Sequence, residues 1–198
     1  SNSYVDGPLI KVINQGDSFL FPIGKDDDIG NKLTLSESQA GTTEWTVEYV
    51  NPNDTYTSYN DPLSYVNSYD RWIVSATSGR EAKISINWDS NSDLTPANTQ
   101  NGTSDMRVAK YDESNTVWNE LSSSASGTNS AGTVTTSSRV TIPAEGYSLF
   151  STACINTVKP QAKLTPYASV CGTGGIPVSF SSSPNLNYVL TYTLDGVL

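Results

Sequence analysis

Residues 82–88 read Ala-Lys-Ile-Ser-Ile-Asn-Trp, so that apolar and polar side chains alternate along the stretch. Successive side chains of a β-strand point to opposite faces of a sheet. The stretch therefore predicts a half-buried strand with Ile84, Ile86 and Trp88 on its buried face. No long window of the sequence keeps the period of a helix, which predicts an all-β fold. The other predicted strands are residues 9–13, 19–21, 32–35, 44–50, 72–76, 106–111, 117–121, 132–142 and 147–151.

These short strands predict a two-sheet β-sandwich, jelly-roll-like in type, because a single open sheet would leave one apolar face in water. Turn signals such as Asn101-Gly102 separate the strands. Residues 122–132 consist of Ser, Ala, Gly, Thr and Asn. That segment has little to bury, and we expect it to be a mobile surface loop.

The chain is expected to hold one complete domain and part of another. Residues 1–155 carry the strand pattern of the sandwich, and a proline-containing stretch follows at residues 157–166. Beyond it only residues 176–180 and 188–194 read as strands, too few to cover both sides of a sandwich. Residues 156–198 are therefore predicted to be a linker and an incomplete second β module. The alternative is that these strands complete the first sheet.

The charge and hydropathy of the chain argue against two classes of partner. Its 11 Lys and Arg against 20 Asp and Glu give a net charge of -9, which repels nucleic acid and anionic lipid. Charged residues make up only 16% of the chain, and a polar surface built from Ser, Thr, Asn and Gly is typical of extracellular proteins. No apolar run approaches the roughly 20 residues that span a bilayer. We expect a secreted protein with no nucleic-acid partner and no membrane insertion.

The chain contains no histidine. This removes the commonest general base, the Ser-His-Asp and Cys-His arrangements and the usual zinc site. The glycine-rich residues 172–175 precede a predicted strand rather than a helix, so they are a turn and not a phosphate loop. A pair of carboxylates of glycosidase type remains as an alternative. We expect no catalytic residues and no enzyme activity.

Two acidic loops are candidates for a calcium site, because hard cations prefer oxygen ligands from loops. The alternative for both loops is a solvated β-turn, in which Asp and Asn are common. Calcium is the only cofactor that the sequence offers. Its candidate ligands are Asp26, Asp27, Asp28, Asp89, Asn91 and Asp93.

A long loop at residues 51–70 interleaves tyrosines with Asn and Asp. Sugar rings stack on aromatic faces while their hydroxyls bond to amides and carboxylates, so this composition is typical of carbohydrate binding. The alternative is that the tyrosines lie along the sandwich edge and cover its core. The candidate glycan-binding residues are Tyr56, Tyr59, Tyr65 and Tyr69.

The two cysteines, Cys154 and Cys171, would close a short loop. In an oxidising compartment such a disulfide stabilises a fold by roughly 3 kcal/mol. The alternative is two free, buried thiols. We expect the disulfide, at the junction between the two modules.

Two segments near the N-terminus carry a family resemblance. Residues 4–11 read Tyr-Val-Asp-Gly-Pro-Leu-Ile-Lys, and residues 18–25 read Ser-Phe-Leu-Phe-Pro-Ile-Gly-Lys. A Gly-Pro strand followed by such a Phe-Pro-Ile-Gly turn resembles a recurring region of large secreted surface proteins of Bacteroidota. Downstream, Val170-Cys171-Gly172 resembles the start of the immunoglobulin-like (Ig-like) or PKD-like repeats that follow in such proteins. Further matches lie at residues 69–72, 84–89, 106–111 and 131–134.

The resemblance implies export by the type IX secretion system and display on the cell surface, associated with the outer membrane, as in gliding-motility adhesins. The implied partners are neighbouring modules of the same long chain and the secretion machinery during export. The tyrosine loop adds surface glycans as candidate partners. We therefore expect a non-catalytic structural or adhesive module. The alternative is a carbohydrate-binding module attached to a polysaccharide-degrading enzyme.

Overall fold

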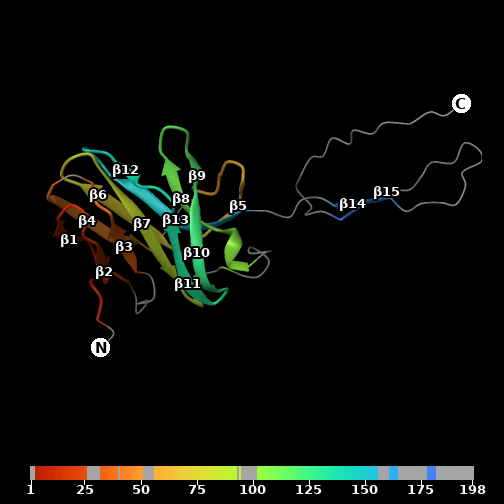
Figure 1. The fold of residues 1–198 in the computed structure, drawn as a ribbon, viewed down its shortest axis with the longest axis horizontal. Coiled ribbons are helices and arrows are strands. Elements are labelled where there is room, and N and C mark those ends of the chain that lie inside the picture. Colours follow the sequence, from red (N-terminus) through yellow and green to blue (C-terminus); the bar gives the residue numbers. More distant parts are fainter. Residues whose placement is uncertain are drawn as a thin grey trace, which may run out of the picture. The chain divides into compact units, whose positions relative to one another are not determined.

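The structure is a computed structural model of the 198-residue chain (Figure 1). It describes residues 3–25, 32–39, 41–50, 56–92, 94 and 102–155, with the backbone of residues 161–164 and 178–181. The chain divides into two units, Ser1–Thr157 and Val158–Leu198. This division lies close to the boundary predicted after residue 155. The Ig-like or PKD-like character of the second unit stays a prediction.

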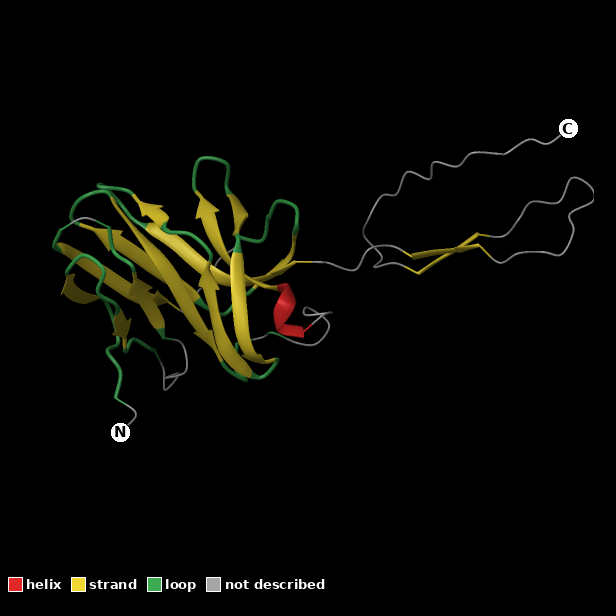
Figure 2. Cartoon of the chain, in the orientation of Figure 1, coloured by secondary structure: helices red, strands yellow, loops and turns green. Residues whose placement is uncertain are grey.

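The first unit is a sandwich of two antiparallel sheets, which confirms the predicted all-β fold (Figures 1 and 2). The only helical element of the described residues is the 3-10 turn η1 (Gly102–Asp105). The described residues contain no helix long and apolar enough to cross a membrane. The first sheet has the order β1 (Leu9–Ile13), β4 (Thr43–Val50), β6 (Arg71–Ala76), β13 (Ser148–Ile155), β8 (Met106–Asp112) and β9 (Val117–Leu121), with β5 (Leu63–Val66) also paired to β13. The second sheet has the order β10 (Ser123–Thr128), β11 (Ala131–Thr136), β7 (Arg80–Trp88), β3 (Leu33–Ser36) and β2 (Phe19–Phe21), with β12 (Val140–Ile142) also paired to β7.

A central core fills the space between the two sheets. As the alternation predicted, Ile84, Ile86 and Trp88 of β7 are buried, and they meet Trp45 and Trp72 of the first sheet in one apolar cluster. Each fully buried large side chain contributes roughly 1.5–3 kcal/mol by leaving water. The central core comprises Ile13, Phe21, Ile23, Leu33, Leu35, Trp45, Val47, Tyr49, Trp72, Val74, Ala76, Ala82, Ile84, Ile86, Trp88, Leu94, Met106, Val108, Val134, Val140, Ile142, Phe150 and Cys154.

The first sheet also carries a second apolar layer on its outer face. Every residue of β13 is buried, because alternate side chains enter the central core and this second layer. The nearly continuous run of small and apolar residues in β13 suits burial on both faces. We call the second layer the outer cluster; it comprises Leu63, Val66, Ala109, Tyr111, Trp118, Leu149, Ala153 and Ile155.

The segment between β4 and β6, expected to be one long loop, contributes to the outer cluster. It includes the short strand β5, which pairs with the end of β13, and a bridge from Tyr59 to Trp118. The backbone nitrogen of Asn60 donates to the Trp118 carbonyl at 2.9 Å, and the Trp118 nitrogen donates to the Ser58 carbonyl at 2.9 Å. These backbone hydrogen bonds fix the segment against the edge strand β9.

The expectation of a mobile loop at residues 122–132 is wrong. Residues 123–128 form β10, which pairs along its whole length with β11. The Trp88 indole Nε1 donates to the Thr128 carbonyl at 3.1 Å, and a Cβ at Gly132 would overlap the Trp88 ring. The small residues therefore let the hairpin approach a large buried ring, which composition alone does not reveal.

The single strand predicted at residues 132–142 is two strands, β11 and β12. Both pair with the same edge of β7, and a bend separates them. At the bend the Thr136 Oγ1 accepts a hydrogen bond from the backbone nitrogen of Ile84 at 3.1 Å. The hydroxyl replaces a carbonyl of the ladder there, so the backbone is free to turn.

The second unit contains an antiparallel pair of strands, β14 (Gln161–Leu164) and β15 (Val178–Ser181). The second of these overlaps the strand predicted at residues 176–180. The strand predicted at residues 188–194 lies outside the described residues.

Candidate binding groove

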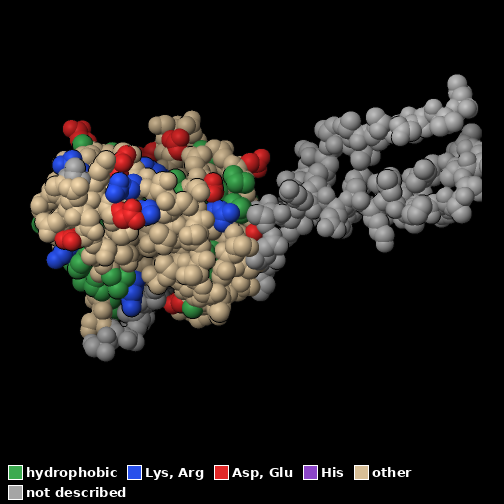
Figure 3. Space-filling model, in the orientation of Figure 1, with side chains coloured by type: hydrophobic (Ala, Val, Ile, Leu, Met, Phe, Trp, Pro, Cys, Tyr) green, Lys and Arg blue, Asp and Glu red, His purple; other side chains and the backbone are tan. Residues whose placement is uncertain are grey.

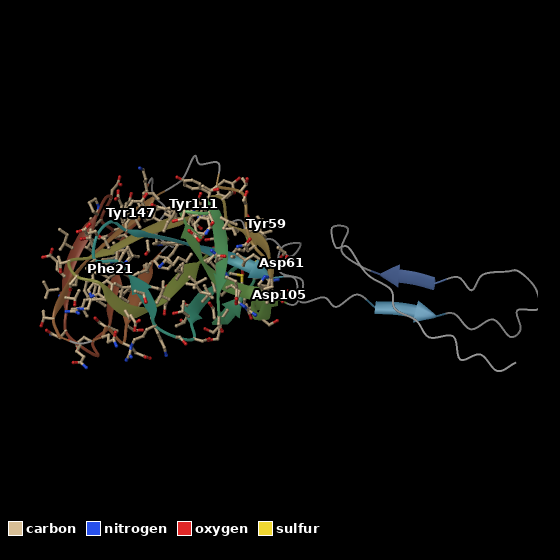
Figure 4. All side chains as sticks on the ribbon, turned by 90° about the horizontal axis from the view of Figure 1, so that it is seen from above. Phe21, Tyr59, Asp61, Asp105, Tyr111 and Tyr147 are labelled. Carbon is tan, nitrogen blue, oxygen red and sulfur yellow. The ribbon has the colours of Figure 1, made fainter. Side chains whose placement is uncertain are left out.

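A groove of about 510 Å³ lies on the first unit, and its walls come from the two sheets. One wall is formed by β8 and β9 with the turn that joins them, and the other by β12, the connection from β12 to β13 and the first two residues of β13. Its size falls within the roughly 300–1,000 Å³ of small-molecule sites. Figure 4 shows two lining residues, Tyr111 and Tyr147, along one side of the sandwich.

The turn between β8 and β9 is held by one carboxylate. Asp112 accepts hydrogen bonds from the backbone nitrogens of Ser114 and Asn115 at 3.0 and 3.3 Å, and from the Asn115 side-chain amide at 2.7 Å. The amide and backbone hydrogen bonds from Asn115 lower the pKa of Asp112 most, with help from Ser114 and Lys110. Asp112 is thus ionised and engaged in shaping the wall of the groove.

A stack of tilted aromatic rings lies beside the groove. The Tyr111 ring lies 5.2 Å from the Trp118 ring and 4.4 Å from the Tyr56 ring, measured between centroids. Trp118 is fully buried, its Nε1 donates to the Tyr56 carbonyl at 2.9 Å, and the Arg71 guanidinium lies over its ring at 4.7 Å. Aromatic pairs and cation–π contacts each add roughly 0.5–1.5 kcal/mol beyond burial, so the stack is well fixed.

Tyr147 follows Gly146 in the turn before β13, lines the groove and is 48% exposed. A hydrogen bond with the Glu113 carboxylate is the main reason that the pKa of Tyr147 is raised, and the charge of Glu113 and partial burial raise it further. An electrostatic interaction with Tyr56 makes the smallest contribution to the raised pKa of Tyr147. Tyr147 and Glu113 therefore interact electrostatically at the groove that both residues line.

Two further polar side chains line the groove. The Lys110 Nζ donates to the Thr141 carbonyl at 2.9 Å, which ties the first sheet to the second. Burial lowers the pKa of Lys110, and the nearby Asp112 opposes that shift. Asn119 accepts a hydrogen bond from the Asn60 amide at 2.8 Å. Within the part of the chain that the structure describes, the Asn119 side-chain NH₂ donates to no partner.

The structure separates the four tyrosines predicted as glycan-binding residues. Tyr56 lies beside the groove through its contact with Tyr111, whereas Tyr59 donates its hydroxyl to the Ser64 carbonyl at 2.8 Å. Tyr65 is half-buried and packs against the central core, and Tyr69 is exposed. Tyr59, Tyr65 and Tyr69 are not among the lining residues of the groove.

The sequence reasoning missed Tyr111 and Tyr147. Tyr111 sits in a strand whose alternation indicated only burial, and Tyr147 stands alone after a turn glycine. A signal for Tyr147 is the Glu145-Gly146-Tyr147 turn, which places an aromatic ring on an otherwise polar connection.

A buried polar network anchors the segment that precedes β6. The Asp70 carboxylate accepts hydrogen bonds from the Tyr49 hydroxyl at 2.6 Å and from the Asn67 amide at 2.7 Å. The Arg71 guanidinium donates to the Ser151 hydroxyl at 2.9 Å and to the Asn67 carbonyl. Buried charges are tolerated when they are hydrogen-bonded in this way, and we assign this network a structural role.

One candidate calcium loop is partly described. The Asp89 carboxylate accepts a hydrogen bond from the backbone nitrogen of Asn91 at 2.8 Å, and the Ser92 hydroxyl accepts one from the Asp89 nitrogen at 3.2 Å. These are the contacts of an ordinary Asx turn. Asp26, Asp27, Asp28 and Asp93 lie outside the described residues, which contain no cluster of potential metal ligands. A calcium site in these loops stays a prediction.

Cys154 is a free, fully buried thiol in the central core, and its Sγ lies 3.7 Å from the Met106 Sδ. Burial raises the pKa of this thiol to about 12. Cys171 lies outside the described residues, so the disulfide stays a prediction. The burial of Cys154 favours the alternative of a free thiol, because a partner sulfur would have to enter the core.

The functional assignment therefore depends on the geometry of this chain. Comparison with known protein families, with characterised proteins and with solved structures finds no match to it.

Proposed function

We propose that the chain is a non-catalytic adhesive module of a secreted bacterial cell-surface protein. The observation that carries the proposal is the groove, whose walls are joined across the two sheets by the hydrogen bond from the Lys110 Nζ to the Thr141 carbonyl. A site on a rigid scaffold binds without the cost of ordering its own side chains. Such a scaffold suits a module whose task is to hold a surface.

The surface of the first unit supports an extracellular setting. Figure 3 shows one face on which charged side chains are scattered among uncharged polar groups and backbone. Across the chain only 16% of the residues are charged. With a net charge of -9, such a chain lacks the positive field of a nucleic-acid-binding protein.

The two segments that resemble bacterial surface proteins lie together in the fold. The backbone nitrogen of Val5 donates to the Pro22 carbonyl at 2.8 Å, and the Gly24 nitrogen donates to the Val5 carbonyl at 3.2 Å. Phe21 and Ile23 are fully buried in the central core. The two segments on which the family resemblance depends thus form one structural unit, which supports treating them as a single motif.

The strand order supports adhesion more than load-bearing in this module. Since β1 is antiparallel to β4, β4 to β6 and β6 to β13, β1 and β13 run in opposite directions. The start of β1 and the end of β13 therefore point the same way along the sheet. Tension between these two ends would open the β1–β4 ladder pair by pair from Leu9 and Val47 rather than shear all of its pairs at once.

The alternative of a carbohydrate-binding module on a polysaccharide-degrading enzyme is favoured by the tyrosines at the groove. The two functions differ in the parent protein, and both need a binding surface on this chain.

A flow assay tests the proposed function. Beads coated with the chain are expected to stay on at least one surface among glass, a protein film, mucin, cellulose and chitin at shear rates that remove albumin-coated beads. Removal of both kinds of bead from every surface at the same shear rate would contradict an adhesive role.

A further inference from the structure

We propose that the groove lined by Tyr111, Glu113, Asn119 and Tyr147 binds a neutral oligosaccharide. The inference rests on the proposed adhesive function and names the ligand class of its site. None of these residues belongs to the tyrosine loop from which carbohydrate binding was predicted.

Two tyrosines, Tyr111 and Tyr147, line the groove. Tyr147 lines the groove and is about half exposed, so part of this residue is open to a ligand. A ring with an apolar face and a polar tip suits the two kinds of surface of a sugar. Tyr111 lines the same groove and is held by the rings of Tyr56 and Trp118.

Polar groups line the groove beside these rings. The Glu113 carboxylate at the groove offers acceptors, and the Asn119 NH₂ offers donors that no described residue uses. Lys110 has two further N–H groups besides the one directed to Thr141. Sugar hydroxyls both donate and accept, so they match a groove that presents both kinds of group.

The charge of the groove favours neutral over acidic sugars. Asp112 and Glu113 both line the groove against one lysine, Lys110, so its charged lining is mainly acidic. The chain as a whole carries a net charge of -9. An acidic polysaccharide would meet repulsion from the groove and from the whole surface.

The experiment is a glycan array followed by calorimetry, with the full chain. The array holds neutral cello-, xylo-, manno- and chito-oligosaccharides beside acidic galacturonans and sulfated galactans. We expect binding to at least one neutral class, with a Kd of about 10 μM to 1 mM. Binding to acidic members alone, or to no member, would overturn the inference.

Substitutions then locate the site. Tyr147→Ala should weaken binding of the best array oligosaccharide by about tenfold, equivalent to about 1.4 kcal/mol. Tyr147→Phe keeps the ring and should restore most of the affinity. Asn119→Asp keeps the acceptor for Asn60 but removes the donors, and should weaken binding about threefold or more.

The matched control is Tyr69→Ala, which removes an exposed tyrosine of the predicted loop that does not line the groove. It should leave the affinity unchanged, with the melting temperature of each variant recorded to show that it folds. Loss of binding in Tyr69→Ala with Tyr147→Ala unaffected would move the site to the loop and refute the groove.

The outcomes separate this inference from the proposed function. Beads that hold to glass or a protein film while the array stays empty would retain the adhesive function and refute the glycan. Array binding by a protein whose beads wash off every surface would retain the glycan site and refute adhesion.

Discussion

The ring of Tyr56 packs against the ring of Tyr111, with 4.4 Å between the centroids and 40° between the planes. This contact joins the connection between β4 and β6 to the wall of the groove, although the two residues are far apart in the sequence. The same connection supplies the Tyr56 carbonyl to the Trp118 indole. The groove and the outer cluster are therefore parts of one packed region.

Trp118→Ala should destabilise the first unit by about 3–5 kcal/mol, because it leaves a cavity in the outer cluster and removes the partner of Arg71. Trp118→Phe keeps an aromatic ring but loses the hydrogen bond to the Tyr56 carbonyl, and should cost less. Urea unfolding followed by circular dichroism measures both. The exposed Tyr69→Ala should change the free energy of unfolding by no more than about 0.5 kcal/mol. Equal midpoints for Trp118→Ala and Tyr69→Ala would show that the outer cluster contributes little.

Gly132→Ala should cost about 2–3 kcal/mol or more, because the added Cβ would overlap the Trp88 ring and the Ser126 carbonyl. Gly79→Ala is the matched control, since its Cβ would meet only ordinary contacts of 3.5 Å and beyond and its backbone needs no positive φ. Thermal melting should show a clear loss for the first and little change for the second. Similar melting temperatures for the two variants would contradict the close approach of β11 to Trp88.

The Cys154 thiol should resist labelling in the folded protein. Burial raises its pKa from 9.0 to about 12, so hardly any thiolate forms at pH 9. The pKa is raised in the folded state, so the stability that the protonated thiol contributes is complete below about pH 9 and is lost as the pH rises towards 12. Labelling kinetics of a Cys171→Ser variant, with and without denaturant, check this. Fast labelling of the native variant at pH 9 would contradict the buried position.

The disulfide is tested on the unaltered chain, denatured without reductant. Two titratable thiols would exclude a bridge between Cys154 and Cys171, and none would establish it. The buried position of Cys154 leads us to expect two.

Glu113→Gln should lower the pKa of Tyr147, because the Glu113 carboxylate both bonds to the hydroxyl and repels the tyrosinate charge. In the intact protein, the stability that this pair adds is present below the ordinary tyrosine pKa and is lost as the pH rises through the raised pKa. Alkaline titration of tyrosinate absorbance, as the difference between each protein and its Tyr147→Phe derivative, isolates this residue among the 11 tyrosines. An unchanged midpoint after Glu113→Gln would show that Glu113 and Tyr147 do not interact at the groove.

Alternation predicted the strands that face one core, and it was less informative elsewhere. Ile84, Ile86 and Trp88 are on the buried face as expected, and β1, β2 and β9 have the predicted bounds. The strand β10 was missed because its residues bury almost nothing and its stability comes from backbone pairing with β11. The strand β5 was missed because it is short and because the outer cluster that holds it depends on residues distant in the sequence.

The binding site was less predictable than the fold. A tyrosine-rich composition pointed to the connection between β4 and β6, and one of its members, Tyr56, does lie beside the groove. Tyr147, Glu113 and Asn119 come from separate turns and strands, and sheet topology alone brings them together. No pattern within one stretch of the sequence indicates that these three residues line the same groove.

The most direct test of the account is an amide chemical-shift map of the labelled chain, recorded with millimolar neutral oligosaccharides of the cello, xylo, manno and chito series. The account predicts that at least one series shifts the amides of residues 110–113, 119–121 and 141–149, and that Tyr147→Ala abolishes those shifts. Shifts confined to residues 59–69, or no shift with any series, would contradict a neutral-glycan site in the groove.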